Sequence, residues 1–242
     1  AQNVNVSSNN ITISRGANAI WLVGTKNINV SQNTVLFNNS AYSTKDNVFG
    51  LRIENSTNAT INANTINANN IPYVQNVIIL DKSKGVNIAG NTLTGAKKHG
   101  INLTSSSASI SANTISGNKE NGIFCYKNST MTTNKNRITG NKKHGIFVNE
   151  CKGKSKINRD TIKSNKQCGI AVQKGNNVTI NSAKISKSGK NGIYIFKKSK
   201  ATINKCTVSN NKKDGIYSTL SSTTNIKKGT VSKNKGNGIY YT

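Results

Sequence analysis

Short runs of alternating apolar and polar residues recur along this chain at a nearly constant interval. The dipeptide Gly-Ile opens seven of these runs, at steps of 22 to 24 residues. Its glycines are Gly100, Gly122, Gly145, Gly169, Gly192, Gly215 and Gly238. Such self-similarity is typical of solenoids, in which each repeat packs only on its neighbours. The pattern therefore predicts a stack of one repeated unit.

A second pattern, apolar-x-x-Asn-x-apolar, recurs at the same interval. Its ten central residues are Asn9, Asn33, Asn64, Asn91, Asn113, Asn136, Asp160, Ala183, Cys206 and Gly229. Each copy pairs with one apolar anchor of the first pattern. The ten anchors are Ile20, Leu51, Ile78, Ile101, Ile123, Ile146, Ile170, Ile193, Ile216 and Ile239. Ten copies of both signatures predict about ten rungs.

Residues within a rung alternate as they do in strands. The segment 192–196 reads Gly-Ile-Tyr-Ile-Phe, with β-branched residues at the positions expected to face inward. Frequent Gly, Asn, Ser and Lys breaks leave no room for a helix in each repeat. We predict an all-β coil of three short strands per rung, with equivalent strands paired in parallel about 4.8 Å apart. Ile170 then faces inward and Ala171 outward, so an aspartate should unfold the protein at Ile170 and be tolerated at Ala171.

The rung 113–132, NTISGNKENGIFCYKNSTMT, resembles the right-handed parallel β-helix repeats of the pectate lyase-like superfamily. The resemblance covers essentially the whole chain. It implies a ladder of stacked Asn side chains at a tight turn, a position that suits Asn because Asn tolerates a left-handed backbone. Ala183 and Cys206 depart from that pattern, so the ladder should be interrupted in the last rungs. The superfamily hosts lyases, hydrolases, epimerases, phage tailspikes and adhesins, so the resemblance does not select an activity.

We expect residues 1–242 to form a single parallel β-helix domain, taken from a longer, exported protein of bacterial type. Neither a signal peptide nor a run of 18 or more apolar residues is present, so no membrane insertion is predicted. The resemblance points to a secreted or cell-surface location. The sequence does not predict an oligomeric state.

The four cysteines occupy different places in the rung. Cys125 is an inward strand residue, Cys151 lies in the following turn, and Cys168 precedes a Gly-Ile dipeptide. Cys206 replaces a ladder Asn. We therefore expect no two of them to stack, and predict buried free thiols rather than a disulfide framework. Because no Cys/His spacing typical of a metal site appears, the sequence predicts no metal and no cofactor.

The chain is strongly basic, and its charged residues are unevenly distributed. The formal net charge is +27. Residues 1–95 carry six basic and three acidic residues, whereas the remainder carries 28 basic and four acidic ones. One set of lysines precedes the Gly-Ile strands: Lys97, Lys98, Lys119, Lys142, Lys143, Lys166, Lys190, Lys212, Lys213 and Lys235. A second set follows them: Lys127, Lys152, Lys154, Lys174, Lys197, Lys198 and Lys200. Stacked rungs should turn each set into a stripe along the rod.

Aromatic residues recur between the two stripes. The first outward positions hold Phe124, Phe147, Ala171, Tyr194, Tyr217 and Tyr240. An aromatic strip flanked by cations suits a uronate or sulfated polysaccharide, because rings stack on sugar faces and lysines pair with acidic groups. Nucleic acid suits the same charge and ranks lower, because no nucleic-acid motif is present. Alternatively, the rings only stabilise the sheet and the lysines only keep the protein soluble.

Two longer connections suggest a second candidate site. The spacing from ladder turn to strand anchor is eight residues in most rungs, but the segments 36–50 and 67–77 are extended. Long loops carry function more often than short ones. The outward residues Trp21, Arg52, Glu54 and Asp81 lie on the neighbouring strands, with Tyr42, Asp46 and Tyr73 in the loops and His99 before the next strand.

Arg52, Glu54 and Asp81 are the candidate catalytic residues. Paired carboxylates with an arginine suit a polysaccharide hydrolase, and an arginine with a lysine suits a lyase or epimerase. The alternative is a surface cluster of ion pairs, joining Arg52 to Glu54 and Asp81 to Lys82 or Lys84. His99 and His144 occupy equivalent Lys-Lys-His-Gly-Ile positions, which favours a repeat feature over a catalytic role.

The preferred hypothesis is a β-helix module that binds an extended anionic polysaccharide along its Gly-Ile strands. The candidate binding residues are Trp21, Phe124, Phe147, Tyr194, Tyr217, Tyr240, Lys142, Lys143, Lys166, Lys190, Lys212 and Lys213. A polysaccharide lyase, epimerase or hydrolase is the first alternative. A passive adhesin or stalk, whose repeats supply only length, is the second.

Overall fold

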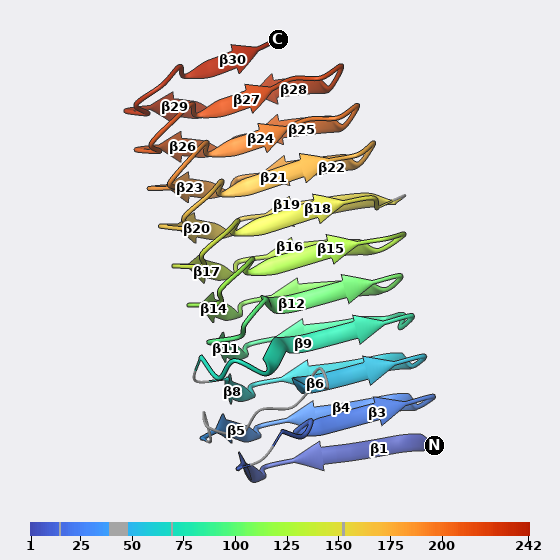
Figure 1. Ribbon diagram of the computed structural model, residues 1–242. Helices are drawn as coiled ribbons and strands as arrows, with labels where there is room; N and C mark the ends of the chain where they lie inside the picture. The colour runs from blue at the N-terminus through green and yellow to red at the C-terminus, as the bar shows by residue number, and fades with distance from the viewer. Residues whose placement is uncertain (15, 39–47, 69, 152) are drawn as a thin grey trace.

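The computed structural model is a tall stack of β rungs, in which each rung contributes one strand to each of three sheets (Figure 1). It describes residues 1–14, 16–38, 48–68, 70–151 and 153–242. These residues form 30 strands and no helix. Accordingly, no described helix is long and apolar enough to cross a membrane. The described part of the chain confirms the predicted all-β solenoid of about ten turns with three parallel sheets.

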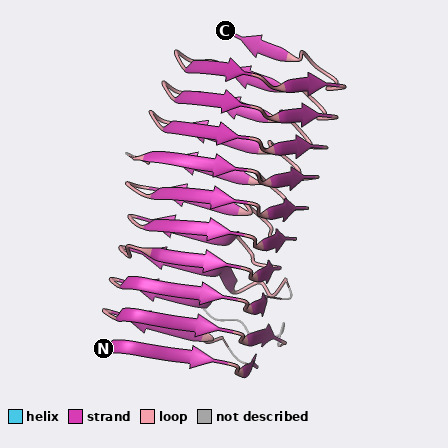
Figure 2. Ribbon diagram, turned by 180° about the vertical axis from the view of Figure 1, so that it is seen from behind, coloured by secondary structure: helices cyan, strands magenta, loops and turns pink. Residues whose placement is uncertain are grey.

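Each sheet contains ten parallel strands. Sheet A, which faces the viewer in Figure 2, consists of β1 (Gln2–Ser7), β4 (Lys26–Ser31), β7 (Thr57–Asn62), β10 (Val86–Ala89), β13 (Ser107–Ser111), β16 (Thr130–Asn134), β19 (Lys154–Asn158), β22 (Asn177–Asn181), β25 (Lys200–Asn204) and β28 (Thr223–Lys227). Sheet B consists of β2 (Asn10–Ile13), β5 (Thr34–Phe37), β8 (Thr65–Asn67), β11 (Thr92–Thr94), β14 (Thr114–Ser116), β17 (Arg137–Thr139), β20 (Thr161–Lys163), β23 (Lys184–Ser186), β26 (Thr207–Ser209) and β29 (Thr230–Ser232).

Sheet C contains the Gly-Ile strands, which carry most of the candidate site residues. It consists of β3 (Ile20–Val23), β6 (Val48–Glu54), β9 (Val74–Asp81), β12 (His99–Thr104), β15 (Ile123–Tyr126), β18 (Ile146–Asn149), β21 (Ile170–Gln173), β24 (Ile193–Ile195), β27 (Ile216–Ser218) and β30 (Ile239–Tyr241).

The core is a column of apolar side chains that stack in register from rung to rung. Ile146 pairs with Ile170, which pairs with Ile193, and all three are fully buried. Such a narrow column needs few apolar residues per rung, which explains the modest hydrophobic content of 33%. The assigned inward facing of the Gly-Ile strands is thereby confirmed.

The glycine of the Gly-Ile motif is required by close packing between rungs. A Cβ atom on Gly145 would lie 2.4 Å from Cγ2 of Ile162 and 2.7 Å from the carbonyl oxygen of Gly169. The same two clashes recur at Gly122, against Ile138 and Gly145. No side chain fits at these distances, which explains why glycine precedes the anchor in eight of the ten rungs. Ala19 and Val77 occupy this position in the other two rungs.

The predicted asparagine ladder is present. In each step, the backbone N–H and the side-chain Nδ2 of one ladder residue donate to Oδ1 of the next. The ladder runs through Asn9, Asn33, Asn64, Asn91, Asn113, Asn136 and Asp160. It stops before Ala183, which has no side-chain oxygen, so the interruption predicted for the last rungs is confirmed.

The expectation that the ladder residues themselves adopt a left-handed backbone is wrong. The left-handed residue is the one before each ladder residue, such as Ser8 at φ 58°, Gln32 at 57° and Lys135 at 57°. Asn is therefore used at the ladder position for its stacking amide and not for a left-handed backbone. Further ladders, not expected from the sequence, line other corners. Asn118 donates to Asn141 and Asn141 to Asn165, and the N–H of Ser83 donates to Oγ of Ser106.

Three further expectations need correction. Ala171 lies in the outward column between Phe147 and Tyr194, but its side chain is fully buried, so a charge there is not expected to be tolerated. The extended connections are shorter than 36–50 and 67–77, because both ends of each segment belong to strands. Finally, all four cysteines are buried free thiols, as predicted, but two of them do meet: the sulfur atoms of Cys125 and Cys151 lie 3.1 Å apart.

Candidate ligand-binding face

An aromatic column runs along the outer face of sheet C. Phe124 stacks on Phe147 with ring centroids 5.3 Å apart. Tyr194 stacks on Tyr217 at 5.1 Å, and Tyr217 stacks on Tyr240 at 5.0 Å. These stacks follow from the parallel register, which places equivalent residues of successive rungs side by side. The five aromatic residues of these stacks are at least partly accessible, so the column can contact a ligand.

Buried Ala171 divides this column into two parts. A second aromatic residue in each part widens its surface: Tyr126 stacks beside Phe124 at 5.3 Å, and Phe196 stacks beside Tyr194 at 4.2 Å. The result is two aromatic platforms on one face, separated by a single rung.

Lysines line the side of the platforms where the chain enters sheet C. The backbone N–H groups of these turns donate to carbonyl oxygens of the turn one rung earlier, from Lys142 to Asn118, from Lys166 to Asn141 and from Lys213 to Lys190, so the turns stack in register. Lys142, Lys166, Lys190, Lys212 and Lys213 are exposed and Lys143 is partly exposed. The stacked turns therefore form the basic stripe that the sequence predicts.

Two adjoining hollows lie between this stripe and the platforms. The first, which we call the His99 hollow, has a volume of about 290 Å³ and is lined by His99, Glu120, Asn121, Phe124, Lys143, His144, Phe147 and Gln167. The second, the His144 hollow, measures about 360 Å³ and is lined by His144, Gln167, Cys168, Lys190, Asn191, Tyr194, Phe196, Lys213 and Tyr217.

Both histidines are members of a mixed ladder that precedes the Gly-Ile dipeptides. The backbone N–H of Asn121 donates to Nδ1 of His99 at 3.3 Å, and that of Cys168 donates to Nδ1 of His144 at 3.2 Å. In the rung between them, Oδ1 of Asn121 accepts the N–H of His144. The histidines are thus repeat features, as the sequence predicts, yet their outer edges line the hollows.

Burial holds both imidazoles neutral. It lowers the pKa of His99 to about 3, assisted by the positive charges of Lys143 and Lys98. It lowers the pKa of His144 to about 4, assisted by Lys190 and Lys143. Because Nδ1 accepts a hydrogen bond in each ring, the single proton of the neutral imidazole belongs on Nε2.

Glu120 and Gln167 line these hollows and were not among the residues predicted from the sequence. The sequence contains a pattern that could have identified them. The position before each residue of the mixed ladder is occupied in successive rungs by Lys98, Glu120, Lys143 and Gln167. Glu120 is therefore a carboxylate within a basic stripe, where it accepts from Lys143 at 3.0 Å.

The candidate catalytic residues lie on the same face, nearer the N-terminus. Nη2 of Arg52 lies 2.8 Å from Oε2 of Glu54, and its guanidinium packs 4.8 Å from the ring centroid of Trp21. Asp81 pairs with Glu54 in the strand register. The structure thus brings Trp21, Arg52 and Glu54 into contact, with Asp81 beside them. Among the described residues, neither Lys82 nor Lys84 forms an ion pair with Asp81.

The loop residues associated with that cluster contribute little that can be described. Tyr42 and Asp46 lie outside the described residues, as does Lys152 of the second lysine set. Tyr73 is buried, with only 4% of its surface exposed. Within the described ranges, no three His, Cys, Asp or Glu side chains gather as they would to hold a metal ion.

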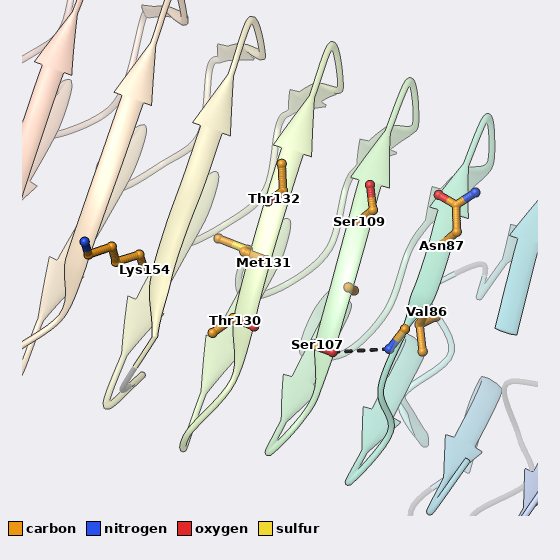
Figure 3. Close-up of a pocket in the computed structure, with 10 residues that line it drawn as sticks. Val86, Asn87, Ser107, Ser109, Thr130, Met131, Thr132 and Lys154 are labelled. Atoms are coloured by element: carbon orange, nitrogen blue, oxygen red, sulfur yellow. Dashed lines mark hydrogen bonds between the residues drawn. The ribbon is translucent and has the colours of Figure 1, made fainter. Parts of the chain in front are cut away.

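A shallow hollow of about 570 Å³ also lies on sheet A, across β10, β13, β16 and β19. Its walls are mostly small, uncharged side chains such as Ser109 and Thr132, and Figure 3 shows Ser107 receiving a hydrogen bond at the edge of the hollow. Among the described residues, Lys154 is the one charged residue that lines it. With a single titratable group, this hollow offers less chemistry than the face of sheet C.

Comparisons with known proteins agree with this architecture. A family model described as a right handed beta helix region matches residues 1–159 and again residues 149–242. Among curated proteins, none matches the sequence significantly.

Solved structures show the same fold at low sequence identity. The Azotobacter vinelandii mannuronan C-5 epimerase AlgE4 A-module is 12% identical, with a TM-score of 0.73, over 98% of this chain and 80% of its own. The periplasmic alginate epimerase AlgG is 15% identical, with a TM-score of 0.64, over 93% and 74%. The enzymatically active domain of bacteriophage CBA120 tailspike protein 2 is 13% identical, with a TM-score of 0.74, over 99% and 42%.

Proposed function

The chain belongs to the right-handed β-helix family, and we propose that it binds an extended anionic polysaccharide along the outer face of sheet C. The observation that carries this proposal is the pairing of stacked aromatic platforms with a stripe of lysines in the same register. Rings offer faces to sugars, and lysines offer counter-charges to carboxylates or sulfates at the spacing of the rungs.

The similar structures support the same ligand class. Two of them are named for alginate and mannuronan, which are chains of uronate sugars. The family and the basic face are consistent with a module that meets polysaccharide outside the cytoplasm, and we propose a secreted or cell-surface location. Nucleic acid would meet the same lysines, and it serves as a competitor in the test.

Binding should depend on where the lysines lie and not on total charge. We expect polygalacturonate or heparin retention to fall steeply with salt, because exposed charges more than roughly 8 Å apart are screened at physiological ionic strength. Replacing Lys142, Lys143, Lys166, Lys190, Lys212 and Lys213 by Gln should abolish retention at that salt. Affinity electrophoresis with each polymer measures the effect.

The matched control removes six lysines from other faces. We choose Lys135, Lys156, Lys163, Lys184, Lys205 and Lys228, which lie along sheets A and B and their connecting turn. This variant has the same net charge and should keep most of its retention. Equal losses in both variants would show that retention reflects bulk charge alone.

The protein is also incubated with each polymer, and the mixture is assayed for released oligosaccharides. Carboxylates at adjacent register positions, Glu54 and Asp81, beside the guanidinium of Arg52 favour an enzyme as the second candidate. Product release that disappears in Arg52→Ala and Glu54→Gln would establish that candidate. Retention without release would exclude a lyase or hydrolase and favour the binding module, and neither retention nor release would leave the passive stalk.

A further inference from the structure

The two hollows contain equivalent histidines in different electrostatic surroundings. Nε2 of His99 lies 3.6 Å from Oε2 of Glu120, a carboxylate that also accepts from Lys143. The outward N–H of His99 therefore already faces an acidic group supplied by the protein. An anionic ligand that approached this hollow would be repelled by Glu120.

The His144 hollow has the same construction without the carboxylate. Gln167 occupies, one rung beyond His144, the position that Glu120 occupies one rung beyond His99. The ammonium groups of Lys190 and Lys143 are close enough to His144 to lower its pKa. Lys190 and Lys213 line this hollow together with Gln167. A neutral N–H donor, an amide and two cations thus converge there, and Nε2 of His144 has no hydrogen-bond partner among the described residues.

We infer that the His144 hollow is the subsite that holds one acidic group of the polymer. The inference rests on the proposed function and assigns the ligand unit: a sugar carrying a carboxylate or a sulfate ester. The acidic group accepts from Nε2 of His144 beside Lys190 and Lys213, and the ring of the sugar stacks on Tyr194. The volume of about 360 Å³ suits one small ring.

The chain supplies its own conservative replacement for the test. Asn121 and Asn191 occupy the ladder position of the histidines, and Oδ1 of each accepts the required backbone N–H. His144→Asn should therefore keep the ladder and lose the outward donor. His99→Asn is the matched control, because its outward edge already faces Glu120.

The measurement is calorimetric titration with oligogalacturonate, a heparin-type oligosaccharide and a neutral maltooligosaccharide. We expect His144→Asn to raise the Kd for at least one acidic oligomer about tenfold. His99→Asn should leave that Kd within about twofold of the parent's. Gln167→Glu should weaken binding as His144→Asn does, because it recreates the arrangement around His99. The two acidic oligomers distinguish carboxylate from sulfate.

Each outcome decides something. Unchanged binding in His144→Asn, or equal weakening in both histidine variants, overturns the subsite while the proposed function stands. Failure of the parent protein to bind either acidic oligomer overturns the proposed function itself. Thermal melting of each variant separates a lost contact from a lost fold.

A separate observation concerns Cys125 and Cys151. Each cysteine differs from the residues that occupy the equivalent position in neighbouring rungs. Cys125 lies between Leu103 and Val148 on the inward side of sheet C, and Cys151 follows Ser129 at the corner where serines stack. The two cysteines meet, with their sulfur atoms 3.1 Å apart. Both residues are 97% or more buried.

We propose that these thiols form a disulfide that links two successive rungs. Closing the sulfur distance to about 2.05 Å needs a shift of only about 1 Å. With a small-molecule disulfide as oxidant, both thiols lose their protons, the S–S bond forms, and the oxidant is reduced to two thiols. Because both sulfurs are buried, oxidation accompanies folding, and the folded protein resists reducing agents.

Refolding in a glutathione redox buffer, followed by alkylation in concentrated urea and peptide mass mapping, tests the link. We expect a Cys125–Cys151 linked peptide with Cys168 and Cys206 alkylated, and a Tm roughly 5–10 °C above that of the reduced protein. The double variant Cys125→Val/Cys151→Ser should lose this redox dependence. Alkylation of all four cysteines, or a redox-dependent Tm in the double variant, would contradict the proposal.

Discussion

At the scale of single residues, Asp160 ends the asparagine ladder with a buried carboxylate. Its Oδ1 accepts from the backbone and side chain of Asn136, as an asparagine would. Its second oxygen accepts from the hydroxyl of Thr133. Thr133 itself interrupts a column of isoleucines, between Ile110 and Ile157. The buried hydroxyl of Thr133 and the buried carboxyl of Asp160 therefore supply each other's hydrogen-bond partner.

The stability of the protein should fall as the pH rises through the titration of Asp160. Burial raises the pKa of its carboxyl from 3.8 to about 6, despite the hydrogen bonds from Thr133 and Asn136. The folded state then binds the proton more tightly than the unfolded chain, so this contribution is largest below pH 4 and is lost by about pH 6. The shift corresponds to roughly 3 kcal/mol.

Replacing Asp160 by Asn removes that titration. The amide presents the same Oδ1 to Asn136 and adds a donor, so we expect a gain of roughly 1–3 kcal/mol at pH 7 and little change at pH 4. Urea unfolding at a series of pH values measures both. A variant whose stability varied with pH as the parent's does would show that another group is responsible.

At the scale of one element, the entry into sheet C depends on the absence of a side chain. Gly145→Ala places a methyl group against Ile162 and the backbone of Gly169. We expect a loss of about 1–3 kcal/mol in the free energy of unfolding, because neither contact can yield without shifting a rung. Chemical denaturation measures the loss.

Gly140 is the matched control, because its φ is 68° and nothing lies within 4 Å of the position of a Cβ atom. Ser164 and Lys187 occupy the same turn in the next two rungs with φ near 57° and 54°. Gly140→Ala should therefore cost no more than about 1 kcal/mol. A greater loss at Gly140 than at Gly145 would refute the packing explanation.

At the scale of the whole molecule, one face carries both candidate sites. Trp21, Arg52, Phe124 and Tyr240 belong to one outward column of sheet C that runs the length of the stack. The basic residues concentrate beyond residue 95, so the proposed anion-binding surface lies on the C-terminal rungs. This charge gradient along a rod suits a polymer that lies along the stack.

Most of the fold could be read from the sequence because a solenoid is nearly one-dimensional. Each rung contacts only its neighbours, so the interval between Gly-Ile dipeptides sets the stack, and the alternation of residues sets which side chains enter the core. The outward column that contains Arg52 and Phe147 follows from the same two periods.

The sequence by itself determined the period, the three strands per rung, the inward columns and the recurrence of Asn, because these depend only on spacing, and the resemblance to β-helix repeats implied that these Asn side chains stack. The tertiary structure alone decided which side chains meet at the corners, because rungs of 22 to 24 residues shift their turns relative to one another. Corner contacts pair Cys125 with Cys151, and His99 with Glu120. They depend on where side chains of different lengths end, and spacing along the chain does not encode that position.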